Sequence, residues 1–163
     1  MVFDRLLARL LAAPIDAAVA QAMAARAAAD DPLQRVLVHG DRSRLRVHPT
    51  AVVNNALFNM SGGTITVGEQ AFFGHSVSVL TGTHDVTKFG RARQQAITRD
   101  GRDVVIDEGV WLASNAIVVG PCHIGAHAVV GVGAVVIADV EPYEVVAGVP
   151  AKRIRTIDHG GHR

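Results

Sequence analysis

The sequence predicts an all-β solenoid, a parallel β-helix of hexapeptide repeats that carries an N-terminal helix and an excursion loop. Two observations between Ile106 and Glu141 predict it. The first position of every repeat is aliphatic: Ile106, Leu112, Val118, Ile124, Val130 and Val136. The fifth position is small or β-branched: Val110, Ala116, Cys122, Ala128, Ala134 and Val140. A helix repeats every ~3.6 residues and a two-sided strand every ~2, so neither explains a period of six. In a solenoid the first side chain fills the interior, and the fifth must be small to fit beside it.

Residues 1–40 form an N-terminal segment, within which residues 1–29 are predicted to be helical. Four leucines between residues 6 and 11 recur at helical spacing, and an alanine-rich run of strong helix formers follows them. We expect this helix to pack on the end of the solenoid or on a neighbouring subunit. Arg5 and Arg9 flank the leucines, which leaves a membrane-surface helix as the alternative.

The repeats are expected over residues 41–141. In the first of them, Ala51 and Leu57 lie six positions apart and are assigned to the small inward column. The register then slips across Asn59–Gly63, where a glycine-rich turn interrupts the pattern. It resumes at Val67 and continues to the excursion loop.

The excursion loop is predicted by a break in the spacing of the repeats. Val79 and Ile106 both occupy the first column, yet they lie 27 positions apart, which is not a multiple of six. The polar, arginine-rich stretch 85–103 must therefore leave the solenoid, and long loops on rigid scaffolds commonly carry function. After residue 141 the repeats end, and residues 142–163 form a C-terminal extension.

Composition leads us to expect a cytoplasmic domain without a nucleic-acid partner. The 163 residues suffice for one domain with a sizeable core. With 16 basic and 15 acidic residues, the net charge of +1 gives no general attraction to a polyanion such as nucleic acid. No apolar run reaches the length of a membrane span, so membrane association is not expected. The single cysteine, Cys122, falls in the inward column, so we expect it in the core and expect no internal disulfide.

Three motifs resemble one family. TGTHD at residues 81–85, GVWLASN at residues 109–115 and VVAGVPAKRIR at residues 145–155 are similar to stretches of the left-handed β-helix acyltransferases. They point to the branch that contains maltose, galactoside and polysaccharide O-acetyltransferases, and the likeness covers residues 45–157. The resemblance implies a left-handed coil, although physics alone favours a right-handed crossover between parallel strands. It also implies acetyl-CoA as co-substrate, no metal, and a homotrimer with active sites between subunits.

The resemblance makes His84 the candidate catalytic residue. The family uses a histidine at this place, just before the excursion loop, as the general base that takes a proton from the acceptor hydroxyl. The chemistry fits, because a hydroxyl is a weak nucleophile until its proton is removed and histidine titrates near physiological pH. No Ser–His–Asp order or activated cysteine is legible, so we expect direct transfer without an acyl-enzyme. A corner histidine that only caps turn groups is the structural alternative, and the group that orients the ring stays open.

The resemblance also implies which residues bind acetyl-CoA. Trp111 would line the cleft, and the backbone N–H of Ser114 would face the thioester, where such donors stabilise an oxyanion. The residues expected to flank the pantetheine arm are Gly131, Val132, Gly133 and Ala134. The cations expected to hold the phosphates are Lys152, Arg153 and Arg155. Many family members carry a lysine where this chain has Ala138, so the tail should bear more of the phosphate contact. Subunit packing by Trp111 and a merely solvated basic tail are the alternatives.

The acceptor implied by the resemblance is a sugar hydroxyl or glycan, and the residues expected to contact it are Asn55 and Asp85. Asn55 lies near the place where galactoside acetyltransferases have an acceptor-binding asparagine. Asp85 adjoins His84 in the sequence. An asparagine that stabilises a corner is the alternative for Asn55. Because the same fold also acetylates amines, an amino-sugar N-acetyltransferase is the nearest alternative function.

Two other classes of protein are also considered. The γ-carbonic anhydrases share the prism and bind a metal through three histidines, two of which occur as H-x4-H. This chain has Ser114 and Val119 at those two places, and its His123 and His127 are spaced as H-x3-H more than one repeat later. The sequence therefore argues against a metalloenzyme. A non-catalytic scaffold would have no reason to combine the candidate histidine, the tryptophan and the cationic tail.

Overall fold

The computed structural model describes residues 18–21 and 35–158. Residues 18–21 are helical, and the remainder of the helix expected over residues 1–29 lies outside the described residues. A compact unit begins at Val36. Within the two described ranges, no helix is long and apolar enough to cross a membrane.

Three sheets make up the unit that begins at Val36. Sheet A contains, in spatial order, β1 (Leu37–His39), β3 (Leu57–Asn59), β6 (Ser78–Leu80), β9 (Ile117–Val119) and β12 (Val135–Val136). Sheet B contains β2 (Leu45–Val47), β4 (Ile65–Val67), β7 (Val104–Ile106) and β10 (Cys122–Ile124). Sheet C contains β5 (Phe72–Phe73), β8 (Trp111–Leu112), β11 (Val129–Val130), β13 (Glu144–Ala147) and β14 (Lys152–Thr156). Only β14 pairs antiparallel among these strands, and it lies against β13.

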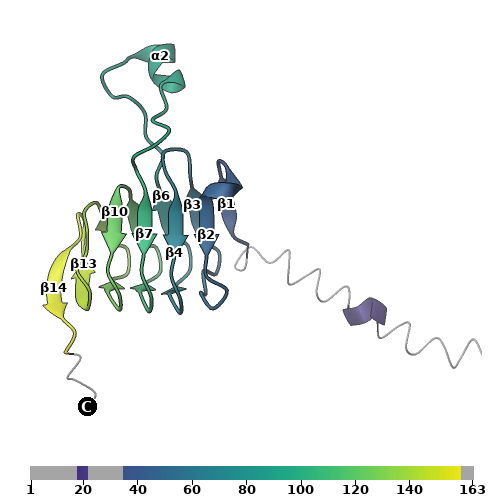
Figure 1. Cartoon of the computed structure of the whole chain (residues 1–163), viewed down its shortest axis with the longest axis vertical. Helices are drawn as coiled ribbons and strands as arrows, with labels where there is room; N and C mark the ends of the chain where they lie inside the picture. The colour runs from purple at the N-terminus through teal and green to yellow at the C-terminus, as the bar shows by residue number, and fades with distance from the viewer. Residues whose placement is uncertain (1–17, 22–34, 159–163) are drawn as a thin grey trace, which may run out of the picture. The chain divides into compact units, whose positions relative to one another are not determined.

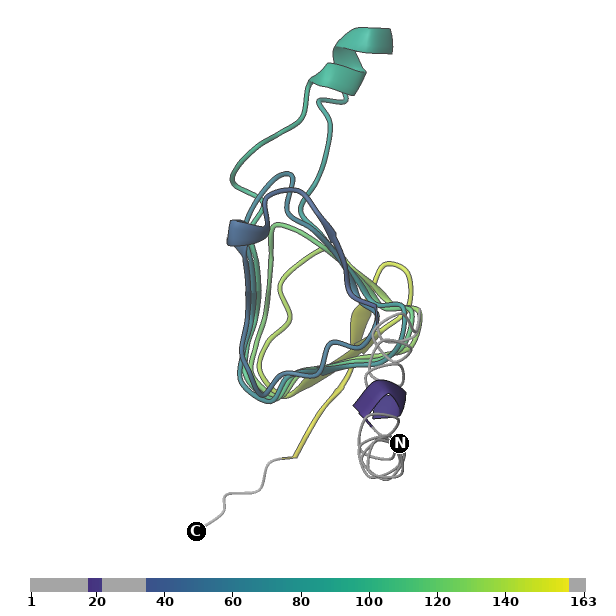
Figure 2. The same cartoon turned by 90° about the vertical axis from the view of Figure 1, so that its right-hand side faces the viewer.

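Up to β13 the chain visits sheets A, B and C in turn, and strands of the same sheet in successive coils pair in parallel. Trp111, for example, lies beside Val129, eighteen positions or three hexapeptides later. Figure 1 shows the coils stacked on one another, and Figure 2 shows the triangular cross-section that results. The unit is therefore the parallel coil that the six-residue period predicts. Its left hand stays a prediction.

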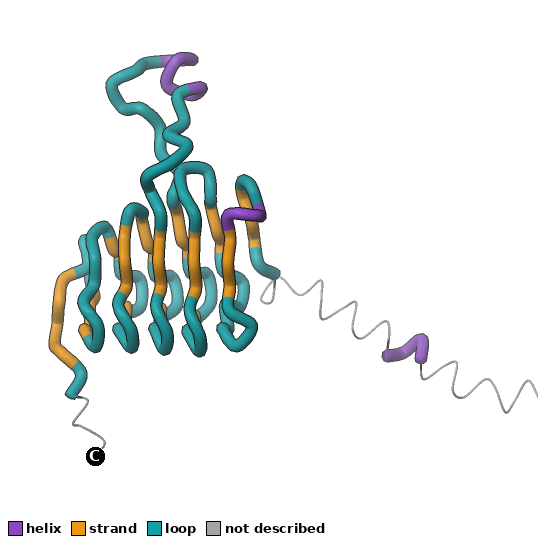
Figure 3. The backbone as a smooth tube through the Cα atoms, in the orientation of Figure 1, coloured by secondary structure: helices purple, strands orange, loops and turns teal. Residues whose placement is uncertain are grey.

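The corners of the triangle are named by the two sheets that they join. The AB corner comprises residues 40–44, 60–64, 81–103, 120–121 and 137–139. The BC corner comprises residues 48–51, 68–71, 107–110, 125–128 and 141–143. The CA corner comprises residues 54–56, 74–77, 113–116 and 131–134. The AB corner holds the short helix η1 (Arg42–Arg44) and the excursion loop, which carries α2 (Gly90–Gln95). Figure 3 shows that this loop stands outside the coil.

The interior of the coil is filled by the two predicted columns. The six first-column residues from Ile106 to Val136 are at most 1% exposed. The six fifth-column residues from Val110 to Val140 are at most 5% exposed. Both columns are therefore confirmed. Because the coils stack, these side chains form one continuous apolar core, whose burial is the main force that holds the fold together.

One predicted column position is wrong. Leu57 lies on the outside of β3, and Phe58 is completely buried in its place. The reason is the first CA corner, where the small column runs from Ala51 to Ala56, five positions rather than the six of the later coils. Asn54 turns this shorter corner in the left-handed region, with φ of 43°, a conformation that asparagine tolerates. The missing residue shifts β3 by one position, which moves alternate side chains to the other face.

The coil extends beyond the expected range 41–141 at both ends. β1 lies before residue 41 and pairs in parallel with β3. β13 lies after residue 141 and pairs in parallel with β11. The strand at each end has only three or four residues, which is shorter than one repeat. A period of six therefore cannot be recognised there, and the strand is identified by its pairing with the neighbouring coil.

Asp103 holds the AB corner together at the end of the excursion loop. Its Oδ1 accepts hydrogen bonds from the N–H of Thr64 at 2.6 Å and from the Thr64 hydroxyl at 2.9 Å. These bonds, the one from the N–H first, lower the pKa of Asp103 below its ordinary value of 3.8. A carboxyl whose pKa is lower in the folded state stabilises the fold above its unfolded pKa and loses that contribution as the pH falls.

We therefore expect Asp103→Asn to lower the Tm at neutral pH and to weaken the pH dependence of stability below about pH 4. The reason is that asparagine accepts hydrogen bonds without titrating. Thermal unfolding of both proteins over a pH series measures this. Melting curves that shift in parallel with pH would contradict it.

Candidate active site

His84 lies at the AB corner, where the chain leaves β6 and enters the excursion loop. It forms an isolated antiparallel bridge with Ile97 on the returning arm of that loop. Its Nδ1 lies 2.9 Å from the carbonyl oxygen of Arg93. Because a carbonyl oxygen can only accept, Nδ1 carries the hydrogen, and in the neutral ring Nε2 keeps its lone pair. A backbone carbonyl thus orients the ring, in the tautomer that a base acting through Nε2 requires.

A hollow of about 210 Å³ lies against His84. The other residues that line it are His39, Asn59, Ser61, Gly82, Thr83 and Ile97. Asn59 Oδ1 accepts a hydrogen bond from the N–H of Ser61 at 2.9 Å. Gly82 leaves room for this amide, because a Cβ there would lie 2.9 Å from Asn59 Nδ2 and the Asn59 side chain would have to shift. The hollow therefore presents imidazole, amide and hydroxyl groups, which suit a polar molecule.

His39 and Asn59 were not among the predicted site residues. They lie side by side in β1 and β3. His39 was missed because β1 precedes the expected start of the repeats. Asn59 was missed because the short CA corner shifts the register of β3. The signal that could have found them is the alternation at residues 57–59, where a buried Phe58 places its neighbours on the outer face.

Asp85 adjoins His84, but its carboxylate is engaged within the loop. Oδ1 accepts hydrogen bonds from the hydroxyl of Thr87 at 2.6 Å and from its N–H at 3.0 Å. Oδ2 lies 3.6 Å from Nζ of Lys88. The Thr87 hydroxyl and then its N–H lower the pKa of Asp85. Asp85 therefore shapes the first turn of the loop, and its expected contact with the acceptor stays a prediction.

Ser114 and the stretch 131–134 lie together at the CA corner. The carbonyl of Ser114 accepts a hydrogen bond from the N–H of Gly133 at 3.0 Å, and Ser114 Oγ accepts one from the N–H of His75 at 3.1 Å. Val132 is 72% exposed, and a Cβ at Gly133 would meet nothing within 4 Å. The backbone at this corner is therefore accessible to an extended ligand.

Asn55 also lies at the CA corner. Its Oδ1 accepts a hydrogen bond from the N–H of Ser76 at 2.7 Å, and its Nδ2 lies 3.5 Å from Ser76 Oγ. Its side chain thus links two successive coils at a corner, which is the structural alternative to acceptor binding. Within one chain, Asn55 and His84 lie at opposite ends of the strands of sheet A, Asn55 before β3 and His84 after β6.

Trp111 lies on the outer face of sheet C and is 43% exposed. Its ring stacks on that of Phe72, with centroids 5.7 Å apart and an angle of 13° between the planes. An exposed pair of stacked aromatic rings is a surface for another apolar or planar group. This place is compatible with lining a cleft and also with subunit packing.

The cationic tail forms β14 at the end of sheet C. Lys152 lies opposite Ala147, beside the CA corner, and Arg155 lies opposite Val145, further along the strand. Arg153 Nε lies 3.6 Å from Glu144 Oε1. All three cations are exposed.

The candidate residues thus fall into two groups at two corners of the triangle. His84 and the hollow beside it lie at the AB corner, from which the loop projects in Figure 2. The residues expected to bind acetyl-CoA lie at the CA corner or on sheet C. Sheet A separates the two corners by the length of a three-residue strand, about 10 Å. One chain therefore does not bring the two groups together.

Comparison with known proteins finds relatives among the acetyltransferases. No family model matches the chain. Over 112 residues, or 69% of the chain, it is 37% identical to serine acetyltransferase 2 of Arabidopsis thaliana and covers 32% of that protein. Over 104 residues it is 35% identical to galactoside O-acetyltransferase of Lactococcus lactis subsp. lactis, a match that covers 59% of this chain and 49% of that one.

The fold is shared with a hexapeptide-repeat-containing acetyltransferase from Vibrio cholerae O1 biovar eltor, solved in complex with acetyl coenzyme A. The TM-score is 0.53 and the identity 26%, over 83% of this chain and 78% of that one. The chain is thus similar in sequence to serine and galactoside acetyltransferases and in fold to a hexapeptide-repeat acetyltransferase. It spans between 32% and 49% of the length of the two curated relatives.

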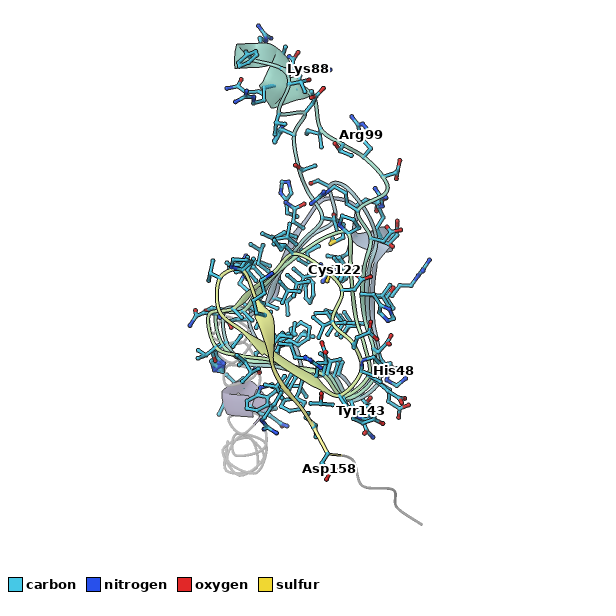
Figure 4. All side chains as sticks on the ribbon, turned by 90° about the vertical axis from the view of Figure 1, so that its left-hand side faces the viewer. His48, Lys88, Arg99, Cys122, Tyr143 and Asp158 are labelled. Atoms are coloured by element: carbon cyan, nitrogen blue, oxygen red, sulfur yellow. The ribbon has the colours of Figure 1, made fainter. Side chains whose placement is uncertain are left out.

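The two histidines considered above as metal ligands, His123 and His127, lie on sheet B and at the BC corner. His123 Nε2 lies 2.8 Å from Asp107 Oδ2, and His127 Nε2 lies 3.9 Å from Glu108 Oε1. In the described part of the chain, no group of three or more His, Cys, Asp or Glu residues could hold a metal ion. Cys122 is buried as predicted and is labelled inside the prism in Figure 4. Burial raises the pKa of its thiol to about 12, so it remains protonated.

The exposed tail leads to a prediction for the coenzyme. Charge-assisted contacts to phosphate are stronger than neutral ones, but exposed ion contacts remain modest and weaken with salt. We expect the double change of Lys152 and Arg155 to alanine to raise KM for acetyl-CoA about three- to tenfold and to reduce its salt dependence. Saturating kcat should stay unchanged, because a tail that contacts only the coenzyme phosphates would bind ground and transition states alike.

The matched control is Arg153→Ala, whose guanidinium already has Glu144 as a partner. It should change KM less than the double variant does. Steady-state kinetics over a salt series measures both effects. An unchanged KM at low salt in the double variant would show that the phosphates are held elsewhere.

Proposed function

We propose that this chain is an acetyl-CoA-dependent O-acetyltransferase that acts on a sugar hydroxyl, with His84 as general base. The observation that carries the proposal is the orientation of the His84 ring. The Arg93 carbonyl fixes the hydrogen on Nδ1, so that Nε2 is the basic atom, and a polar hollow lies against the residue. Relatives named as serine and galactoside acetyltransferases support the choice of reaction.

The mechanism is a direct transfer. Nε2 of His84 takes the proton of the acceptor hydroxyl while the oxygen attacks the thioester carbonyl. Backbone N–H groups at the CA corner, that of Ser114 among them, stabilise the oxyanion of the tetrahedral intermediate. As the intermediate collapses, the carbon–sulfur bond breaks and the imidazolium returns its proton to the departing sulfur. The products are the acetyl ester and free coenzyme A, and the base is regenerated.

We propose that a second copy of the chain completes the site. The outer positions of sheet A are largely apolar: Leu37, Leu57, Leu80, Ile117, Val119 and Val135. The outer positions of sheet B are more polar: Arg46, Thr66, Val105 and His123. A heterologous contact that covers sheet A can bring the AB corner of one copy to the CA corner of the next. Three such contacts close a ring, so a homotrimer is the expected assembly.

The shape of the hollow favours a sugar over a small amino acid as acceptor. A second hollow of about 380 Å³ shares Ser61 and Ile97 with the one beside His84. It is lined further by polar residues that include Asp41, Arg44 and Asp100. Together the two adjoining hollows offer more polar-lined volume than a single serine needs.

The test is a panel of acceptors offered with acetyl-CoA, in which release of the free thiol is followed and the product is identified by mass spectrometry. The panel contains mono- and disaccharides, amino sugars and serine. Transfer to a sugar oxygen is the expected result. Transfer to an amino group would favour the N-acetyltransferase, and transfer to serine alone would overturn the sugar assignment. Light scattering that shows an active monomer would overturn the shared site.

A further inference from the structure

We propose that Arg44 is a positioning residue for His84, which it acts on through the returning arm of the excursion loop. The inference rests on the proposed role of His84 as general base. Arg44 lies in η1, at the AB corner two coils before the loop, and the sequence offers no pattern that links it to the histidine.

Arg44 holds the returning arm at two points. Its Nη1 donates to the carbonyl oxygen of Arg99 at 2.8 Å, and its Nη2 donates to Asp100 Oδ1 at 2.7 Å. The Arg44 side chain is 24% exposed, whereas that of Asp100 is 82% exposed. A forked contact from a planar guanidinium fixes direction as well as distance. Arg99 marks this arm in Figure 4, where Lys88 lies near the tip of the loop.

From this anchor a continuous set of backbone contacts leads to His84. The N–H of Thr98 donates to the carbonyl of Thr83 at 3.2 Å, and Ile97 bridges to His84 itself. The carbonyl of Ala96 accepts from the N–H of Asp85 at 2.9 Å. The two arms are thus joined across the base of the loop.

The last contact of this set is the one that orients the ring. The Arg93 carbonyl accepts from His84 Nδ1–H at 2.9 Å and also from the N–H of Ala96 at 3.2 Å. Arg93 is held in turn by its own side chain, whose Nε donates to the Lys88 carbonyl at 2.6 Å and whose Nη2 donates to the Val86 carbonyl at 3.1 Å. The segment that orients His84 is therefore bonded to the outgoing arm through the Arg93 side chain and is continuous with the returning arm through Ala96.

Apolar packing within the chain does not hold this segment in place. In α2, a completely described element, no residue is buried, and the neighbouring Phe89 is 77% exposed. The position of the Arg93 carbonyl then depends on polar contacts, which are the bonds of the Arg93 side chain inside the loop and the contacts that join the two arms at its base. Arg102, whose Nε donates to the Thr81 carbonyl at 2.8 Å, secures the foot of the arm, and Arg44 secures its middle.

The experiment compares Arg44→Met and Asp100→Asn with the unchanged protein. We expect kcat to fall about three- to tenfold in both, with KM for acetyl-CoA and the Tm unchanged, because an exposed ion contact is modest and the donor site lies at another corner. Arg44→Lys should recover only part of the rate, since lysine cannot make the forked contact. The charge-reversed pair Arg44→Asp with Asp100→Arg should recover more than either reversal alone.

The matched control is Lys88→Met, which removes an exposed ion pair with Asp85 inside the loop, 3.6 Å long, and leaves the anchor to the coil intact. It should keep kcat. If Arg44→Met and Asp100→Asn keep kcat while His84→Ala is inactive, the positioning role is wrong and the proposed function stands. A fall in kcat accompanied by a lower Tm in the same variants would also reject the positioning role, because the contact would then serve only the stability of the fold. If His84→Ala itself keeps its turnover, the proposed function fails.

Discussion

Replacing His84 with alanine should reduce kcat by about 10²–10⁴-fold, the usual loss when a general base is removed. Acetyl-CoA should bind with unchanged affinity, because the proposed base acts on the acceptor proton and the residues expected to bind the coenzyme lie at the CA corner and on sheet C. The fold should be unaffected as well, since the ring is exposed and its one hydrogen bond goes to the loop. Transfer kinetics, together with calorimetric titration of acetyl-CoA, separates these effects.

The control for this variant is His48→Ala. His48 is another exposed corner histidine, and its ring bonds to the hydroxyl of Thr50 at 2.8 Å, but it lies at the BC corner. It should keep its full rate of transfer. Equal rates in His84→Ala and in the unchanged protein would remove the histidine from the mechanism.

The second large effect is a recovery of activity when two inactive variants are combined. His84→Ala removes the base at the AB corner. Val132→Trp should block the CA corner with a bulky side chain, at little cost to the coil because Val132 is 72% exposed. We assume that each site takes its base from one copy and its coenzyme corner from the next. In a random mixture of equal amounts, half of the copies keep His84 and half keep Val132, so about a quarter of the sites have both parts intact.

Co-expression of the two variants with different affinity tags, followed by double purification, isolates the mixed assemblies. Their rate of transfer should far exceed that of either variant alone. A mixture of His84→Ala with His84→Gln serves as control and should stay inactive. Mixed assemblies without any recovery would mean that both groups of residues act within one chain.

The interior of the coil could be predicted from the sequence because it obeys a local constraint. Each coil must fill the same narrow cross-section, so the same restriction on side-chain size recurs every six residues. The first and fifth columns, to which Leu112 and Ala116 belong, follow it without exception between Ile106 and Glu141. The excursion loop was equally legible, since an insertion that is not a multiple of six must leave the coil. These features depend only on counting and side-chain size.

The surroundings of His84 could not be predicted in the same way. Its orienting partner is a backbone carbonyl, and any residue type could supply the carbonyl of Arg93. His39 and Asn59 reach the hollow because β1 and β3 pair in a register that the short first CA corner determines. The separation of the site into two corners likewise follows from how the coil closes. Contacts between coils, and not the period within them, decide these features.

The place of the excursion loop in the stack has a consequence for how such proteins diverge. β6 and β7 flank the loop, and each is paired on both sides with strands of the preceding and following coils. The hydrogen-bond ladders therefore continue past the insertion without a break in register. A corner of this kind can receive, lengthen or lose a segment while the core volumes stay the same. The segment that orients the candidate base can thus be exchanged as a module, and new acceptor preferences can evolve without renewed selection on folding.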